Sequence, residues 1–368
     1  MKKNLGVLAV ALLLSVMVIS CEKKGGNTEA GRGTFSAVFV VTGQLGDMSF
    51  NDSAHRGVLS LRDELGWNVR VTEIGRDQTR WEPTFMDLAE SGQYSLIITN
   101  GSNAGETITL LSKDFPQQKF LLFDTEIEYG KYPNVYAISY KQNEGSFLAG
   151  VLAALVTSSD MRYANPQQRI GFLGGEEHPI ISDFLVGYIE GAQFINPEIE
   201  VLVSYIGSWD DTARGMESAI ALINQGVDII YIAAEQAGLG AVRAGREMGA
   251  YVIGVDSDMS MLFKGIDEDS ANVISTSILK NVDTSILRAG KMFEVGTVPF
   301  GDFEALGIKE DGMGIAMNEY YEKNVPEAIR IIVEDSRQKL IRNEIQVTTA
   351  LGTAPSIIDA IINSARPR

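Results

Sequence analysis

The sequence is poor in the residues on which most catalytic and metal sites depend. It contains one cysteine, Cys21, and two histidines, His55 and His178, in 368 residues. A single cysteine excludes an internal disulfide bond, and neither histidine has a second ligand residue at the spacing of a zinc site. No serine stands in the G-x-S-x-G turn of hydrolases. We therefore expect no bound metal, no cofactor and no enzymatic activity.

Positive charge is also scarce. The chain has 31 lysine and arginine residues against 48 aspartate and glutamate residues, which gives a formal net charge of −17. Binding to nucleic acid depends on a basic face that releases counterions, so the composition argues against a nucleic-acid partner. It also disfavours broad electrostatic attachment to anionic lipid. The length and the hydrophobic content of 45% suit a globular protein with two domains of ordinary size.

The amino terminus has the order of a secretory signal peptide. Lys2 and Lys3 precede an apolar stretch over residues 5–19, which is shorter than the roughly 20 residues that span a bilayer. Residues 18–21, VISC, resemble a lipobox, in which the cysteine becomes the lipidated first residue; a plain cleavage site and a short membrane anchor are the alternatives. We predict a signal peptide over residues 1–20, a lipid on Cys21 and a flexible tether over residues 21–34. The protein would then be anchored to the cell membrane through lipid alone, facing the periplasm or the cell exterior.

The remainder alternates strand-like and helix-like segments. Most strand candidates are continuous apolar runs, which is typical of strands buried on both faces of a parallel sheet. Alternation with helices predicts right-handed βαβ units and an α/β fold with doubly wound sheets. The predicted strands are residues 35–41, 69–74, 95–100, 119–124, 135–140, 169–174, 200–207, 228–234, 251–256 and 273–278. Helices are predicted at residues 51–65, 144–156, 182–195 and 212–225, and the second of these is rich in small residues and suits close packing beside a sheet.

The two halves of the chain resemble each other. Residues 35–74 and 169–207 both have the order strand, polar turn, helix and strand, with a glycine midway along each helix, Gly57 and Gly187. Two similar lobes are therefore expected, with the first change of lobe near residues 140–144. Because ligands of open α/β sheets bind beyond the carboxyl ends of the strands, a site is expected in the cleft between the lobes.

The turn GDMSFNDSAHRG, residues 46–57, stands at the carboxyl end of the first predicted strand. Ser49, Asn51 or Asp52 could cap the helix that follows. A cap does not explain Phe50, a large aromatic residue among polar ones. Phe50 is therefore a candidate ligand contact, with core packing as the alternative.

Other strand ends supply further polar and aromatic candidates. Asp124 and Asp256 close strands without an obvious helix to cap, and Trp209 follows the strand that ends near residue 207. Phe50 and Trp209, one from each lobe, could sandwich a flat ligand, and carboxylates accept hydrogen bonds from vicinal hydroxyls or ring N–H groups. A heterocycle that carries a sugar would use both features. The other candidates at these positions are Ser277, Lys280, Gly238 in the tight turn GLGAVRAG, and Asp211, which is expected to be the N-cap of the helix at 212–225.

Several motifs together resemble the basic membrane protein family, and most closely its purine-nucleoside receptor lipoproteins. The resemblance runs from about residue 36 to residue 320 in unbroken order. It is carried by GDMSFND, KFLLFD, QNEGSFLAG, IGFLGG, DFLVGYIEGAQFINP, GSWDDTARGMESA, GVDIIYIAAEQAGLGAV, YVIGVDSD and STSILKNVD. Each motif alone is weak, but the set is specific.

The resemblance implies a substrate-binding component of an ABC transporter with the type I periplasmic-binding-protein fold. Its lobes would comprise residues 35–141 with about 257–305, and residues 142–256 with about 306–368. The implied partners are a purine nucleoside of the adenosine, guanosine and inosine class, and the permease and ATPase subunits; the implied state is a monomer that closes by hinge motion. The implied contacts are Asp47, Phe50 and Asn51 to base and ribose, Trp209 stacked on the other face of the base, Asp124 and Asp256 to the nucleoside, and Lys280 of the S-x-x-K motif.

Three other functions are the alternatives to this one. The ligand could be a sugar or another small polar metabolite. The chain could be a surface adhesin or antigen that keeps the fold without transport. A nucleoside-cleaving enzyme would need a catalytic base or a metal site, and the sequence offers neither.

Overall fold

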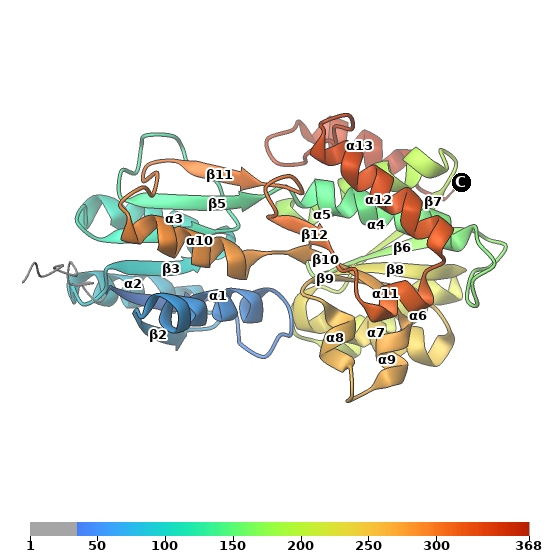
Figure 1. Ribbon diagram of the computed structural model, residues 1–368, viewed down its shortest axis with the longest axis horizontal. Helices are drawn as coiled ribbons and strands as arrows, with labels where there is room; N and C mark the ends of the chain where they lie inside the picture. The colour runs from blue at the N-terminus through green and yellow to red at the C-terminus, as the bar shows by residue number, and fades with distance from the viewer. Residues whose placement is uncertain (1–34, 368) are drawn as a thin grey trace, which may run out of the picture. The chain divides into compact units, whose positions relative to one another are not determined.

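The computed structural model describes residues 35–367. The predicted signal peptide, Cys21 and the tether lie outside these residues. Within residues 35–367, no helix is both long enough and apolar enough to span a membrane. The described chain contains two parallel sheets flanked by helices (Figure 1), which confirms the predicted α/β fold.

The first sheet has the strand order β11-β5-β4-β3-β1-β2, and all of its pairings are parallel. Along β1, Ala37, Phe39 and Val41 belong to one buried core, whereas Val38 and Val40 belong to another on the opposite face. This double burial is the reason why the strand is an unbroken apolar run. The strands are β1 (Ser36–Val41), β2 (Asn68–Glu73), β3 (Leu96–Asn100), β4 (Lys119–Phe123), β5 (Val135–Tyr140) and β11 (Phe303–Leu306). The helices are α1 (Phe50–Leu65) and α10 (Val282–Glu294), which contact each other, and α2 (Trp81–Glu90) and α3 (Gly101–Asp114).

The second sheet has the order β12-β10-β9-β8-β6-β7, in which only the pairing of β12 with β10 is antiparallel. Its strands are β6 (Arg169–Gly174), β7 (Glu200–Tyr205), β8 (Val227–Ala233), β9 (Tyr251–Asp256), β10 (Ile274–Lys280) and β12 (Met313–Ile315). The helices of this lobe are α4 (Gln142–Thr157), α5 (Pro179–Ile195), α6 (Thr212–Asn224), α7 (Leu239–Met248), α8 (Met259–Phe263), α9 (Glu268–Val273), α11 (Glu319–Asn324), α12 (Glu327–Ile341) and α13 (Pro355–Ser364). Two short 3-10 helices, η1 (Gln78–Arg80) and η2 (Glu235–Gly238), precede α2 and α7.

Small residues let α4 and α5 pack with their backbones in near contact. A Cβ atom on Gly150 would lie 2.0 Å from the carbonyl oxygen of Tyr188, and one on Gly191 would lie 2.0 Å from that of Phe147. Real Cβ contacts are never this short, so only glycine fits at either position. The small-residue stretch at 144–156 therefore forms a buried, close-packed helix, as predicted, and it packs mainly against the helix α5 rather than against a sheet.

The chain crosses between the sheets three times, and one predicted crossing is wrong. We expected residues 257–305 in the first lobe, but β10 pairs with β9 in the second sheet, because its apolar residues continue that buried sheet. The chain returns to the first lobe only at α10 and β11, and it then crosses again to β12. In Figure 1 the orange strand β11 lies beside the green strand β5. The predictions also lacked β11 and β12, whereas each predicted strand is present with ends within two residues.

Candidate ligand-binding cleft

A cavity of about 270 Å³ lies at the carboxyl ends of the strands, between the two lobes. This volume is close to the lower limit of small-molecule sites, about 300 Å³. The first lobe contributes, among others, Phe50, Arg76, Asn100, Ser102, Asn103 and Asp124 to its wall; the second contributes, among others, His178, Phe184, Trp209, Glu235, Asp256 and Lys280. A cavity therefore lies at the place where the sequence predicts the site.

Two aspartates organise the turn before α1: Asp47, and Asp52, one of the predicted caps, which accepts hydrogen bonds from two backbone N–H groups of the turn at 2.8–2.9 Å. The Asp47 carboxylate accepts hydrogen bonds from the backbone N–H groups of Ser49, Asn51 and Asp52, at 2.7–3.0 Å. Burial raises the pKa of Asp47, and these donors oppose the shift. Ser49 occupies the N-cap position but makes no side-chain cap bond. The Asp47 carboxylate is thus hydrogen-bonded within its own turn, and Asp47 does not line the cavity.

Phe50 belongs both to the core and to the cavity wall. It is the first residue of α1, its exposure is 5%, and its ring centroid lies 5.4 Å from that of Phe123. The ammonium nitrogen of Lys280 lies 5.1 Å from the centroid of Phe50. Phe50 is therefore a core residue that also lines the cavity, and its contact with a ligand stays a prediction.

Two aspartates hold matching places in the two sheets. Asp124 directly follows β4, and Asp256 ends β9, and both have left-handed backbone conformations with φ of 65° and 62°. Such conformations are strained for residues other than glycine and often mark functional sites. Asp124 forms a buried ion pair with Lys280. Asp256 accepts a hydrogen bond of 2.6 Å from the hydroxyl of Ser49, across the cleft.

Burial raises the pKa of Asp256 to about 6. Lys280 and the Ser49 hydroxyl act against this shift, whereas Asp47 and Asp124 add to it by charge repulsion. A buried carboxyl group whose pKa is raised in this way gains from a hydrogen bond with a neutral donor, because each such donor stabilises its charged form. Asp256 can therefore hold a hydroxyl or an N–H group of a ligand.

Trp209 lies on the wall that the second lobe contributes. It packs so closely on Gly175 that a Cβ atom there would lie 2.4 Å from the indole ring. The guanidinium carbon of Arg76, from the first lobe, lies 5.7 Å from the ring centroid. The neighbouring Asp211 accepts hydrogen bonds from the N–H groups of Ala213 and Arg214, which confirms it as the N-cap of α6.

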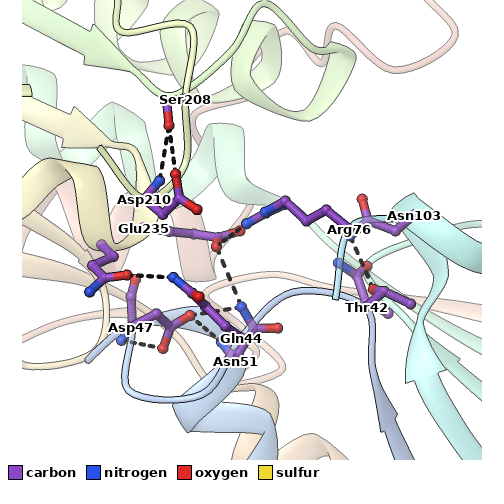
Figure 2. A network of polar contacts seen from close by, with 12 residues as sticks. Thr42, Gln44, Asp47, Asn51, Arg76, Asn103, Ser208, Asp210 and Glu235 are labelled. Carbon is purple, nitrogen blue, oxygen red and sulfur yellow. Dashed lines mark hydrogen bonds and ion pairs between the residues drawn. The ribbon is translucent and has the colours of Figure 1, made fainter. Parts of the chain in front are cut away.

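Arg76 and Glu235 are cavity residues that the sequence prediction missed. They form an ion pair of 2.7 Å between the lobes, and Gln44 donates to Gln236 beside it, also at 2.7 Å. Figure 2 shows this network with Asp47 and Asn51 below Glu235. Burial raises the pKa of Glu235 to about 8 against the opposing effect of Arg76. Glu235 also has a positive φ of 44°, so its position is held by the surrounding structure.

Two further predicted residues do not reach the wall. The Asn51 amide donates to Asp47 and, at 3.4 Å, to Glu235. It therefore contacts a residue of the cavity wall, Glu235, without lining the cavity itself. Gly238 lies in η2, where a Cβ atom would meet Ile232 at 3.1 Å.

His178, in contrast, lines the cavity and caps α5 by accepting the N–H of Ile180 at 3.3 Å. Within residues 35–367, no three histidine, cysteine or acidic residues are grouped as a metal site would require.

The family model of Bmp, described as ABC transporter substrate-binding protein PnrA-like, matches residues 35–350. Basic membrane protein A of Borreliella afzelii is 30% identical over 333 residues, 89% of this chain and 95% of that protein. The ABC transporter nucleoside-binding protein BmpA of Lactococcus lactis is 26% identical, over 94% of this chain and 99% of its own. A solute-binding protein of an ABC transporter system from Aeropyrum pernix has a solved structure with a TM-score of 0.77 and 25% identity, which covers 90% of this chain and 97% of that one.

These matches extend over both lobes, and they agree with a cavity that is lined by polar and aromatic side chains from both of them. The family consists of solute-binding proteins and not of enzymes. Substrate-binding proteins of ABC transporters act outside the cytoplasm and pass their ligand to a permease. The chain belongs to the Bmp family of PnrA-like ABC transporter substrate-binding proteins.

Proposed function

We propose that the protein captures purine nucleosides, of the adenosine, guanosine and inosine class, in the cleft between its lobes and delivers them to an ABC permease. The observation that carries this proposal is the cavity wall itself, which combines two aromatic rings from opposite lobes, Phe50 and Trp209, with the carboxylates of Asp124 and Asp256. The name of the Lactococcus lactis relative, which states nucleoside binding, supports the same ligand class.

The aromatic residues would hold the base and the carboxylates the sugar. A purine between Phe50 and Trp209 gains stacking on both faces, and base–aromatic stacking contributes about 1–3 kcal/mol per base. Vicinal ribose hydroxyls donate to a carboxylate such as Asp256. Arg76 lies over the indole of Trp209, so the base would share that ring with the guanidinium or displace it. No bond in the ligand is made or broken.

Purine nucleosides are expected to bind more tightly than the free bases, by tenfold or more. A buried carboxylate that loses its donor costs about 1–3 kcal/mol, and each 1.4 kcal/mol corresponds to a factor of about ten. Calorimetry with adenosine, guanosine and inosine, and with adenine, guanine and D-ribose, measures this difference. Equal affinities for adenine and adenosine would show that the carboxylates do not hold the sugar. Tight binding of a plain sugar would favour the sugar-receptor alternative.

We also propose that Cys21 carries the lipid that anchors the protein. Acyl chains contribute about 0.8 kcal/mol per buried CH₂ group, and two or more chains give stable anchoring. The variant C21A is expected to appear in the soluble fraction of cells, whereas the wild type sediments with membranes. Retention of C21A in membranes after washing without detergent would contradict a lipid anchor at this residue.

A further inference from the structure

A side chamber adjoins the main cavity. Its volume is about 310 Å³, and Asp124 and His178 line both spaces. Its other wall residues include Glu126, Ser139 and Gln142. Gln142 is the first residue of α4, where the chain has just crossed from the first sheet to the second lobe. The side chamber therefore lies beyond Asp124, at the place where the sugar end of a nucleoside is proposed to bind.

Gln142 is one of seven buried polar side chains in residues 35–367 that have an unpaired atom, and it is the only one of the seven with two such atoms. Its side chain is fully buried, and neither its oxygen nor its nitrogen has a hydrogen-bond partner in the described residues. A buried amide without partners costs about 1–3 kcal/mol, and native proteins pair such groups in the great majority of cases. Both amide atoms are closed to solvent as the side chain stands, so a molecule in the adjoining chamber supplies their partner when the Gln142 side chain turns toward it.

The polar groups of the side chamber select a neutral partner. Asp124 and Glu126 carry carboxylates, and Ser139 makes only a long hydrogen bond of 3.4 Å to Glu126. His178 accepts a backbone N–H at Nδ1, so its Nε2 carries the hydrogen and donates. Burial lowers the pKa of His178, which keeps the ring neutral. The described residues that line the side chamber include no lysine or arginine, and the charge of the nearby Lys280 is already paired with Asp124, so these residues offer a phosphate group no free cation.

We propose that the side chamber binds a neutral polyol group of the ligand, either a second pentose ring or an open hydroxylated chain, with the Gln142 amide as its hydrogen-bonding partner. Hydroxyl groups suit this wall because each can donate to a carboxylate or to the amide oxygen and accept from the amide or from His178. The inference rests on the proposed function, since the polyol would continue from a heterocycle in the main cavity. It extends the ligand class from nucleosides to heterocycles with a longer hydroxylated substituent.

The test compares three probes by calorimetry: adenosine, a disaccharide nucleoside with a second ribose on the adenosine sugar, and adenosine monophosphate. The wild type is expected to bind the disaccharide nucleoside about tenfold tighter than adenosine, as one or two new hydrogen bonds predict, and to bind the phosphate more weakly. Q142M keeps the length of the side chain without its amide, and it is expected to lose the tenfold gain while its affinity for adenosine is unchanged. Q193M is the matched control and is expected to keep the gain, because Gln193 is a half-buried residue of α5 that lines neither the main cavity nor the side chamber.

The exposed residue Glu126 offers a second variant that does not depend on a core substitution. E126Q is expected to reduce the discrimination against the phosphate, because it removes a negative charge from the wall. The inference is overturned if the wild type binds the disaccharide nucleoside no better than adenosine, or if Q142M keeps the whole gain.

Failure of the proposed function has a different signature, since adenosine and the other nucleosides would then not bind at all. In that case the free ribose disaccharide and ribitol are tested by thermal shift. A rise in Tm of the wild type that is absent in Q142M supports the chamber, and equal behaviour of the two proteins overturns it.

Discussion

Replacement of Lys280 by methionine is expected to lower the free energy of unfolding by about 3–5 kcal/mol, which is the usual cost of breaking a buried ion pair from one side. Lys280 is 2% exposed and pairs with Asp124, whose side chain is 7% exposed. Its ammonium group is also surrounded by the rings of Phe50, Tyr140 and Phe184, at 5.1–5.5 Å from their centroids. Without the lysine, the Asp124 carboxylate would stay buried with no opposite charge beside it.

Urea unfolding measures this loss, and two variants identify its cause. Lys291 forms an exposed pair with Glu64, at 3.4 Å and with both side chains more than half exposed, so K291M is expected to change stability by less than about 1 kcal/mol. In the double variant K280M/D124N the buried negative charge at position 124 is removed as well, and much of the lost free energy of unfolding is expected to return. If K280M and K291M unfold at the same urea concentration, the pair does not contribute as the structure indicates.

The fold could be predicted from the sequence where burial on both faces leaves a continuous apolar run. β1, β4 and β9 are strands of this kind, and the buried apolar residues of each belong to two different cores. β11 and β12 could not be predicted in this way, because FEAL and MGI are short and have no such run. Each is an edge strand that depends on one distant neighbour, β5 for β11 and β10 for β12.

The site could be predicted only in part, because a sequence pattern places strand ends but does not show how side chains are oriented. Strand ends reveal Phe50, Asp124 and Trp209, since topology alone brings the carboxyl ends of parallel strands together. They do not reveal how side chains within a turn are oriented, so the residues at 47 and 51 were expected in the cavity although Asp47 holds its own backbone. The ion pair of Arg76 and Glu235 joins residues that are 159 positions apart. Arg76 follows a predicted strand, as the other candidates do, and this is the signal that could have identified it.

Truncation of Phe50 to alanine is expected to reduce both stability and ligand affinity. The side chain is 5% exposed and packs on Phe123, so F50A should lower the free energy of unfolding by about 3–5 kcal/mol. The ring also lines the cavity, and the loss of a base stack of about 1–3 kcal/mol should weaken nucleoside binding by about tenfold to a hundredfold.

A leucine at the same position separates the two effects. F50L restores most of the buried apolar volume, so its urea midpoint is expected to approach that of the wild type. It has no aromatic face, and its nucleoside affinity should therefore stay several-fold below the wild-type value. F123L is the matched control, because Phe123 is fully buried and contacts Phe50 but does not line the cavity; it should lose stability and keep its affinity. A folded F50A that binds nucleosides as the wild type does would mean that the Phe50 ring serves only the core, and that the base stacks elsewhere.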